Sequence, residues 1–195
     1  MKKTIQILFC LLVLVISGCV PPKKEPPKVN SIESLLIEFE PEINGWSSVA
    51  YLVSCSIGFE ENHSMDFLFF RSYNLPYGVL MLAINDDGTV SSKPFRIEPD
   101  NFSTVPITEF LKIDSSDAVK KFYDDETVQK QLRQKSPYQL KYEYIKPDCK
   151  KPVWSLVLHD GLNNSTLFYL DPDSLTVWKS GDYRKSEAYQ AICDE

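Results

Sequence analysis

The chain is poor in glycine, histidine and positive charge. Seven of its 195 residues are glycine and two are histidine, and 21 Lys and Arg stand against 27 Asp and Glu, a formal net charge of −6. So few glycines exclude a collagen-like or low-complexity chain, and an aromatic content of 12% argues against global disorder. The acidic balance argues against a nucleic-acid partner, because affinity for phosphate backbones depends largely on Lys and Arg. The composition is that of a folded protein that binds no nucleic acid.

Motifs for catalysis and for cofactor or metal binding are also missing. The sequence has no Gly-x-Ser-x-Gly motif, and no two glycines lie close enough to form a phosphate-binding loop. No Cys-x-x-Cys spacing indicates a zinc site. The acidic segments 85–88 and 171–173 fit turns, in which Asp and Asn accept backbone hydrogen bonds, better than calcium sites. We therefore expect no cofactor and no metal.

The N-terminal residues have the pattern of a secretory signal peptide. Two lysines precede an almost unbroken apolar run from Ile5 to Ile16, and two small residues separate that run from Cys19. The run is shorter than the about 20 apolar residues that a membrane-spanning helix needs. Its proportions are those of a cleaved secretory signal, with an uncleaved anchor or an ordinary secreted protein as the alternatives.

The segment Ile16-Ser-Gly-Cys19 resembles the lipobox of bacterial lipoproteins. The resemblance implies removal of residues 1–18, attachment of lipid to the sulfur of Cys19 and acylation of the new amino terminus. Several acyl chains anchor a protein durably, whereas one chain binds a membrane only marginally. In Gram-negative sorting, Val20 after the cysteine implies the outer membrane, on its periplasmic face. The predicted location is therefore the cell envelope, with the protein held by lipid.

Residues 19–30 are predicted to form the lipidated Cys19 and a proline-rich tether. Four prolines among residues 20–30 alternate with charged residues. Such a segment favours an extended polyproline conformation of about 3.1 Å per residue, so we expect a semi-rigid spacer of roughly 30 Å. A proline-rich motif that binds a partner is the alternative. Loss of Lys2 and Lys3 leaves 19 basic against 27 acidic side chains, a formal −8, so lipid rather than charge is expected to hold the protein at the membrane.

The rest of the chain is predicted to form two α+β units, residues 31–110 and 111–195. Apolar residues at helical spacing from Ile32 to Ile43 precede four segments with the alternation or the aromatic content of strands, 51–59, 65–73, 77–84 and 89–97. Helix-forming residues over 118–135 precede four more, 138–145, 153–159, 166–170 and 175–179. An offset of 87 residues maps the first set of strands onto the second. We predict that each unit is a helix packed on a curved antiparallel sheet.

The second half resembles the PepSY-like, cystatin-like repeat of envelope proteins. The resemblance depends on Ile113-Asp-Ser-Ser-Asp-Ala118 at the start of a helix, Pro152-Val-Trp-Ser-Leu156 in a strand and Tyr169-Leu-Asp-Pro-Asp173 in a turn. It covers residues 112–180 and, more faintly, 31–97, and Ser174 and Leu175 stand where the family has glycine. It implies two cystatin-like units that bind or inhibit other proteins, and it transfers no catalytic residue.

Three cysteines remain outside the leader and the lipobox. Cys55 shares a strand face with Val53 and Ile57, so we expect it to be a buried thiol that packs as a small apolar residue. Cys149 lies in a loop and Cys193 lies close to the end of the chain. In a compartment that permits disulfides, we predict a bridge between Cys149 and Cys193, with three free thiols as the alternative.

Aromatic residues cluster at 67–70 and 73–77. Strand alternation places Phe67 and Phe69 on one face of a strand, with Leu68 and Phe70 on the other. An uncovered face would form a large apolar patch. We expect packing within the protein to cover both faces, with a bound partner as the alternative.

These observations favour a non-catalytic, membrane-anchored envelope lipoprotein that binds or inhibits another envelope protein. Addition of a partner's strand to an exposed sheet edge is the binding mode that such folds use. The alternative is a structural component of an envelope or secretion assembly. A surface hydrolase that uses His159 with Ser155 or Ser165 is the least favoured hypothesis, and His63 lies in a polar turn.

Overall fold

The computed structural model describes residues 22–59, 65–85, 87–96, 105–161 and 164–193. The predicted signal peptide, Cys19 and His63 lie outside these ranges. Among the described residues, about 37% lie in strands and about 29% in helices, so sheet predominates. Within the described ranges, none of the helices combines the length and the apolar character that crossing a membrane requires.

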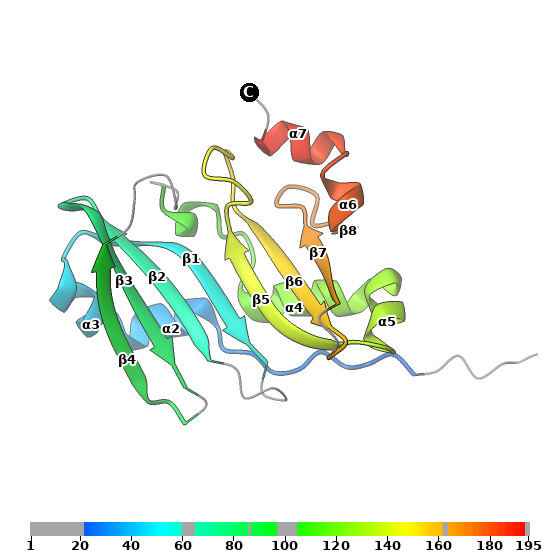
Figure 1. Ribbon diagram of the computed structural model, residues 1–195, viewed down its shortest axis with the longest axis horizontal. Coiled ribbons are helices and arrows are strands. Elements are labelled where there is room, and N and C mark those ends of the chain that lie inside the picture. The colour runs from blue at the N-terminus through cyan, green and yellow to red at the C-terminus, as the bar shows by residue number, and fades with distance from the viewer. Residues whose placement is uncertain (1–21, 60–64, 86, 97–104, 162–163, 194–195) are drawn as a thin grey trace, which may run out of the picture.

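One antiparallel sheet of eight strands organises the fold, in the order β4-β3-β2-β1-β5-β6-β7-β8 (Figure 1). The first half of the chain contributes β1 (Ala50–Gly58), β2 (Asp66–Ser72), β3 (Leu75–Ile84) and β4 (Val90–Arg96). The second half contributes β5 (Ser136–Glu143), β6 (Val153–His159), β7 (Ser165–Leu170) and β8 (Val177–Lys179). Each set of four is a meander, and the two sets meet where β1 pairs antiparallel with β5, with Cys55 opposite Tyr142.

The prediction of two cystatin-like units, each a helix on its own curved antiparallel sheet, is wrong. Pairing of β1 with β5 merges the strands of both halves into one sheet. One hydrophobic core contains buried residues of both halves, among them Ile57 and Leu140. Alternating apolar residues show which side of a strand faces a core, but they do not show which strand lies beside it. Because β1 is buried along most of its length, an edge position would have left its backbone N–H and C=O groups without partners.

The internal repeat behind that prediction is visible in the positions of the strands. β2 spans residues 66–72 and β6 spans residues 153–159, which is 87 residues later at both ends. Each set of four strands also follows a pair of short helices. The repeat therefore relates the order of the elements, while the two halves share one sheet and one core.

Two short helices stand in place of each long helix that the sequence predicted. Pro41 lies in the first turn of the second helix of the first pair. The N–H groups of a first turn have no partner within the helix, so proline removes no helical hydrogen bond there. The carboxylate of Asp125 accepts hydrogen bonds from the backbone N–H groups of Thr127 and Val128, which starts the second helix of the other pair. These helices are α2 (Ile32–Glu38), α3 (Glu40–Trp46), α4 (Ser115–Asp124) and α5 (Glu126–Leu132).

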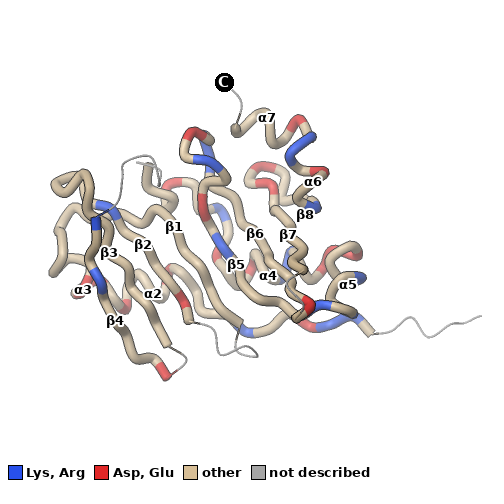
Figure 2. Tube along the Cα trace, viewed as in Figure 1, with Lys and Arg blue, Asp and Glu red and all other residues tan. Residues whose placement is uncertain are grey.

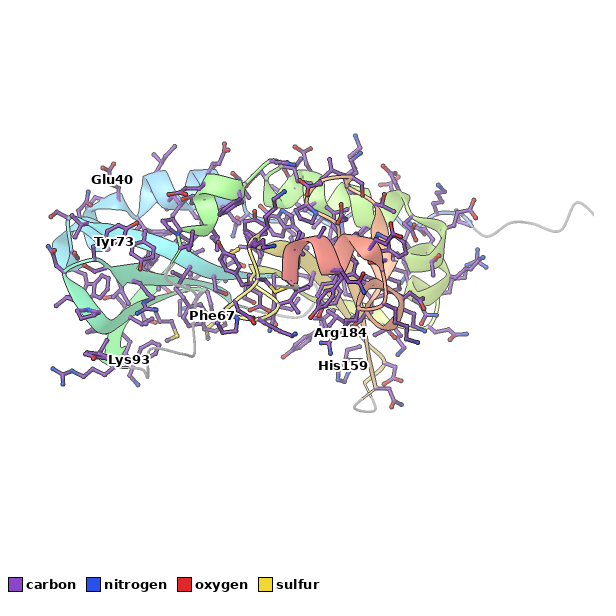
Figure 3. The ribbon with its side chains drawn as sticks, turned by 90° about the horizontal axis from the view of Figure 1, so that it is seen from above. Glu40, Phe67, Tyr73, Lys93, His159 and Arg184 are labelled. Carbon is purple, nitrogen blue, oxygen red and sulfur yellow. A yellow bond between two sulfur atoms is a disulfide. The ribbon has the colours of Figure 1, made fainter. Side chains whose placement is uncertain are left out.

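The helices cover the two faces of the sheet unequally. α2–α5, drawn in pale blue and green in Figure 3, lie along one face together with the single turn η3 (Ile107–Phe110), and the main core fills the space between. The C-terminal helices α6 (Ser180–Tyr183) and α7 (Glu187–Cys193) belong to a second, smaller cluster on the other face, which includes Val153 of β6 and Tyr169 of β7. Over β1–β5 that other face has no helix on it among the described elements.

Candidate functional site

Over β1–β5, the sheet face opposite α2–α5 is covered by no helix among the described elements. Phe67, Lys93 and His159 are all labelled on this side in Figure 3, whereas Glu40 lies on the helix side. We refer to this surface over β1–β5 as the open face. It carries a polar centre, a group of apolar side chains beside that centre, and the edge strand β4.

The polar centre consists of Ser54, Ser56, Lys141 and Glu143. Ser56 lies opposite Lys141 in the register of β1 with β5, and Ser54 hydrogen-bonds Glu143. Ser54 and Ser56 are each 6% exposed, and the buried Oγ of Ser56 has no hydrogen-bond partner among the described residues. Burial raises the pKa of Glu143, while the charge of Lys141 and a hydrogen bond from Ser54 act in the opposite direction. The centre therefore combines a carboxyl group that is costly to ionise with an ammonium group and two hydroxyls.

We expect Glu143→Gln to raise the melting temperature at pH 8 by about 2 to 4 °C, the effect of about 1 kcal/mol in a chain of this size. The folded protein binds a proton at Glu143 more readily than the unfolded protein, because its folded pKa lies above the ordinary 4.5. Stability is therefore lost as the pH rises through the raised pKa, and glutamine avoids that loss. Thermal unfolding at pH 4 and pH 8 checks this. Equal melting temperatures for the two proteins at pH 8 would contradict it.

Apolar side chains flank the polar centre on the side of β2 and β3. Phe67 lies beside Ser56, and Phe69 lies beside Ser54 and opposite Met81. All three apolar side chains are half-buried, and the two phenyl rings are 6.5 Å apart between centroids. The expected alternation is present, since Leu68 and Phe70 are buried in the main core. The open face therefore presents apolar groups that no described helix covers.

Strand β4 forms one edge of the sheet, and β3 is its only strand neighbour among the described strands. Pro94 lies opposite Leu80. Proline has no N–H, so it fits an edge strand only where its nitrogen faces away from the neighbouring strand. Because antiparallel pairs alternate in direction, the N–H groups of Val90, Ser92 and Arg96 also point outward. β4 thus offers an incomplete but regular row of backbone donors and acceptors.

An apolar hollow of about 350 Å³ lies beside this edge. The side chains nearby are unusually exposed for their type, at 43% for Leu75, 56% for Tyr77 and 65% for Tyr73. A side chain at Gly78 would approach Leu75 and the ring of Trp46 to 3.1 and 3.3 Å, so glycine keeps the floor of the hollow open. The lining consists of Trp46, Leu75, Pro76, Tyr77, Gly78, Pro94, Phe95 and Arg96.

His159 lies in a second hollow, of about 490 Å³, at the start of β5 and the end of β6. Its Nδ1 accepts a hydrogen bond from the backbone N–H of Gly161 at 3.0 Å, and its ring lies 5.8 Å from that of Tyr138. A neutral imidazole that accepts at Nδ1 carries its proton on Nε2. Such a ring has no free lone pair on Nε2 with which to accept the hydroxyl proton of Ser165, its cross-strand neighbour. Ser155, the other serine considered, is buried. The geometry at His159 therefore differs from that of a Ser-His-Asp base.

The structure joins Cys149 and Cys193 in a disulfide, the pair that the sequence predicted. Both cysteines belong to the smaller cluster under α6 and α7, so the bridge fastens the end of the chain to the loop before β6. Cys55 is a free thiol with no exposed surface in the main core, as its strand phase indicated. Burial raises the pKa of the Cys55 thiol, which keeps it protonated and unreactive.

The acidic turn before β8 has the bonds expected of a turn. One carboxylate oxygen of Asp171 accepts hydrogen bonds from the backbone N–H groups of Asp173 and Ser174, and Asp173 pairs with Lys112 and Lys151. Leu175, where the resembled repeat has glycine, has φ 54, in the left-handed region that favours glycine. In the part of the chain that the structure describes, no three His, Cys, Asp or Glu side chains are grouped to hold a metal ion.

Sequence reasoning missed the polar centre and the hollow beside β4. Period-two alternation already places Lys141 and Glu143 on one face of a strand, but their contact with Ser54 and Ser56 depends on the pairing of β1 with β5. The hollow joins the end of α3 to β3 and β4, which no local pattern connects.

Comparison with known proteins adds no family to this description. No family model, no curated protein and no solved structure matches the chain. Function therefore has to follow from the residues and surfaces described above.

Proposed function

We propose that this protein is a non-catalytic lipoprotein of the cell envelope, anchored through Cys19, that binds another envelope protein by adding a strand of it to β4. The observation that carries the binding mode is the edge strand β4 with an apolar hollow beside it. Strand addition supplies main-chain hydrogen bonds, and a pocket for a side chain supplies specificity. The anchor is supported by the resemblance of Ile16-Ser-Gly-Cys19 to a lipobox.

The charge of β4 indicates which partner fits. Its seven residues include Lys93 and Arg96 and no acidic residue. Opposite charges on neighbouring strands are stabilising, whereas like charges directly opposite each other are destabilising. A second copy of β4 would bring only positive charges to this edge. The occupant that fits is an extended segment of another protein, with acidic residues along the strand and a large apolar side chain for the hollow.

We expect Ser92→Pro to abolish binding and to leave stability nearly unchanged. The substitution removes an outward N–H of β4 and does not remove a bond to β3. The measurement is photo-crosslinking in cells, with a photoreactive residue in place of Lys93, which is exposed on β4. A discrete adduct should form at position 93 and be lost in Ser92→Pro and in Tyr77→Ser, which removes an exposed ring from the hollow.

Two controls separate the edge from general damage. Ser91→Pro removes an N–H that faces β3, so it should lower the melting temperature as well as the adduct. A photoreactive residue in place of Lys130, on the exposed side of α5, should give no adduct that depends on Ser92. An adduct at position 93 that persists in both Ser92→Pro and Tyr77→Ser would contradict binding at this edge, as would its complete absence.

A further inference from the structure

Residues 22–31, which precede α2, lie against the second half of the chain. We call this segment the strap. Figure 1 shows it running along the ends of the strands from α2 to α5, and it leaves the molecule at the end opposite β4. The sequence predicted a free spacer here, whereas the described part of it is hydrogen-bonded to the folded body near both of its ends.

Gln129 of α5 holds the outer end of the strap. Its side-chain Oε1 accepts the backbone N–H of Lys24 at 2.9 Å, and its Nε2 donates to the carbonyl of Lys24 at 2.9 Å. The amide thus pairs with one residue of the strap through both backbone groups, as a neighbouring strand would. Nε2 also donates to the carbonyl of Tyr123 at 2.7 Å.

Gln129 is 7% exposed, so its amide is buried when the strap is in place. Burial of an amide whose hydrogen bonds are unmade is costly, because the group loses water without gaining a partner. Without the strap, Oε1 and one N–H of Gln129 would lose these partners. A buried glutamine at this position of α5 is therefore explained by the strap that it binds.

Polar contacts also hold the inner end of the strap. The side-chain amide of Asn30 donates to Asp66 at 2.6 Å, and the hydroxyl of Ser115 donates to the carbonyl of Asn30 at 2.5 Å. The backbone N–H of Ile32 donates to Asp114 at 3.0 Å. Between the two ends the strap contains Pro26 and Pro27, whose extended conformation leaves the backbone free for such contacts.

We propose that the strap is a built-in clamp that holds the lipid-anchored protein with its α5 end against the membrane and its β4 edge at the far end of the sheet. This inference depends on the proposed anchoring through Cys19. Lys24 is five residues after Cys19, and an extended chain spans at most about 3.6 Å per residue. The clamp therefore lies within roughly 18 Å of the anchored sulfur, compared with the roughly 30 Å of a free spacer. Seven strand spacings of about 4.8 Å place β4 roughly 30 Å from the other sheet edge.

The clamp, and not charge, sets this orientation. Basic and acidic residues are both present around α5 (Figure 2). Exposed Lys130 and Arg133 share this end of the chain's second helix pair with exposed Asp124 and Glu126. Attraction to anionic head groups would be screened by salt over about 10 Å at 0.1 M. Because hydrogen bonds of a buried amide hold the strap, we expect the same orientation at low and high salt.

Limited trypsin digestion of the mature chain tests the clamp without any lipid. Cleavage after Lys28 follows the population in which the strap is released. We expect Gln129→Ala to raise the cleavage rate about tenfold, the effect of losing two hydrogen bonds of ordinary net strength. Lys24→Pro tests the same contact from the strap, because proline has no N–H to donate. Gln131→Ala, on the same helix, is the matched control, since its side chain makes no hydrogen bond to the strap among the described residues.

Energy transfer to a membrane tests the orientation. Cys55 is buried and Cys149 is paired with Cys193, so Cys19 of the unlipidated mature chain is the one reactive thiol for a maleimide lipid in neutral vesicles with a surface acceptor dye. A donor at position 133 should transfer more strongly than one at position 93, at both low and high salt, and Gln129→Ala should remove most of the difference. The inference would be overturned if energy transfer in the unsubstituted chain were equal from positions 133 and 93, or if high salt removed the difference between them. It would also be overturned if the cleavage rate were unchanged in both Gln129→Ala and Lys24→Pro. Failure of native lipidation would leave these results unaffected, so the two proposals fail separately.

Discussion

Serine in place of both Cys149 and Cys193 is expected to lower the free energy of unfolding by about 4 kcal/mol. The two residues are 44 apart in the sequence, and closing a loop of that length removes this much chain entropy from the unfolded state. The bridge also completes the smaller hydrophobic cluster, which includes Tyr183 of α6 and Ile192 of α7. Because that cluster packs on β6–β8 and on Tyr144 and Ile145 just after β5, the open face over β1–β4 should keep its structure.

Urea unfolding followed by circular dichroism measures this loss, and a reducing agent should shift the native protein to the same midpoint as the double variant. Cys55→Ala is the control, because Cys55 is a free thiol and a protein that lacks it should keep its sensitivity to reduction. An alkylating reagent that modified Cys149 and Cys193 in the unreduced, unfolded protein would contradict the bridge. So would a double variant with unchanged stability.

Cys19→Ser is expected to release the protein from the membrane and to leave residues 1–18 attached. A lipid-modifying enzyme that transfers a group to sulfur has no equivalent acceptor in a serine hydroxyl, which is far less acidic and less nucleophilic than a thiol. Charge does not replace the lipid as an anchor, because the mature side chains, 19 basic against 27 acidic, carry a formal −8. Nearly all of the native protein should sediment with membranes after an alkaline wash, and little of the variant should.

Cys10→Ser is the matched control for this experiment. Cys10 lies inside the apolar run of the same leader and is also a cysteine, but it does not follow the two small residues that precede Cys19. Processing and sedimentation of this variant should match those of the native protein. Equal sedimentation of the Cys19 and Cys10 variants would contradict anchoring through Cys19.

Local patterns in the sequence account for much of the main core. Strand alternation placed Leu68 and Phe70 on the face opposite Phe67 and Phe69, and the structure buries the first pair in the main core. It did not indicate which face the helices cover, and the expectation that packing within the protein covers both faces was wrong for Phe67 and Phe69, which are only half-buried. The phase of Cys55 likewise placed that thiol in the core. The disulfide between Cys149 and Cys193 was predicted from their positions, one in a loop and one near the end of the chain. Neither position is fixed by a strand, so the two cysteines can meet.

The arrangement of the strands does not follow from such patterns. Strand order depends on contacts such as that of Cys55 with Tyr142, between residues far apart in the sequence, and either half could in principle have closed its own sheet. The polar centre follows from that order. The burial of Gln129 could not be predicted from the sequence for a different reason. A glutamine on a helix is usually exposed to solvent, and here the docked strap buries it.

The mass of the intact protein extracted from cell membranes is the decisive measurement for anchoring through Cys19. We predict a chain that begins at Cys19, with residues 1–18 absent and with the added mass of acyl groups on its first residue. A membrane-extracted chain that begins at Met1, or one that begins at residue 19 without added lipid, would show that the protein is not held in the envelope by lipid on this cysteine.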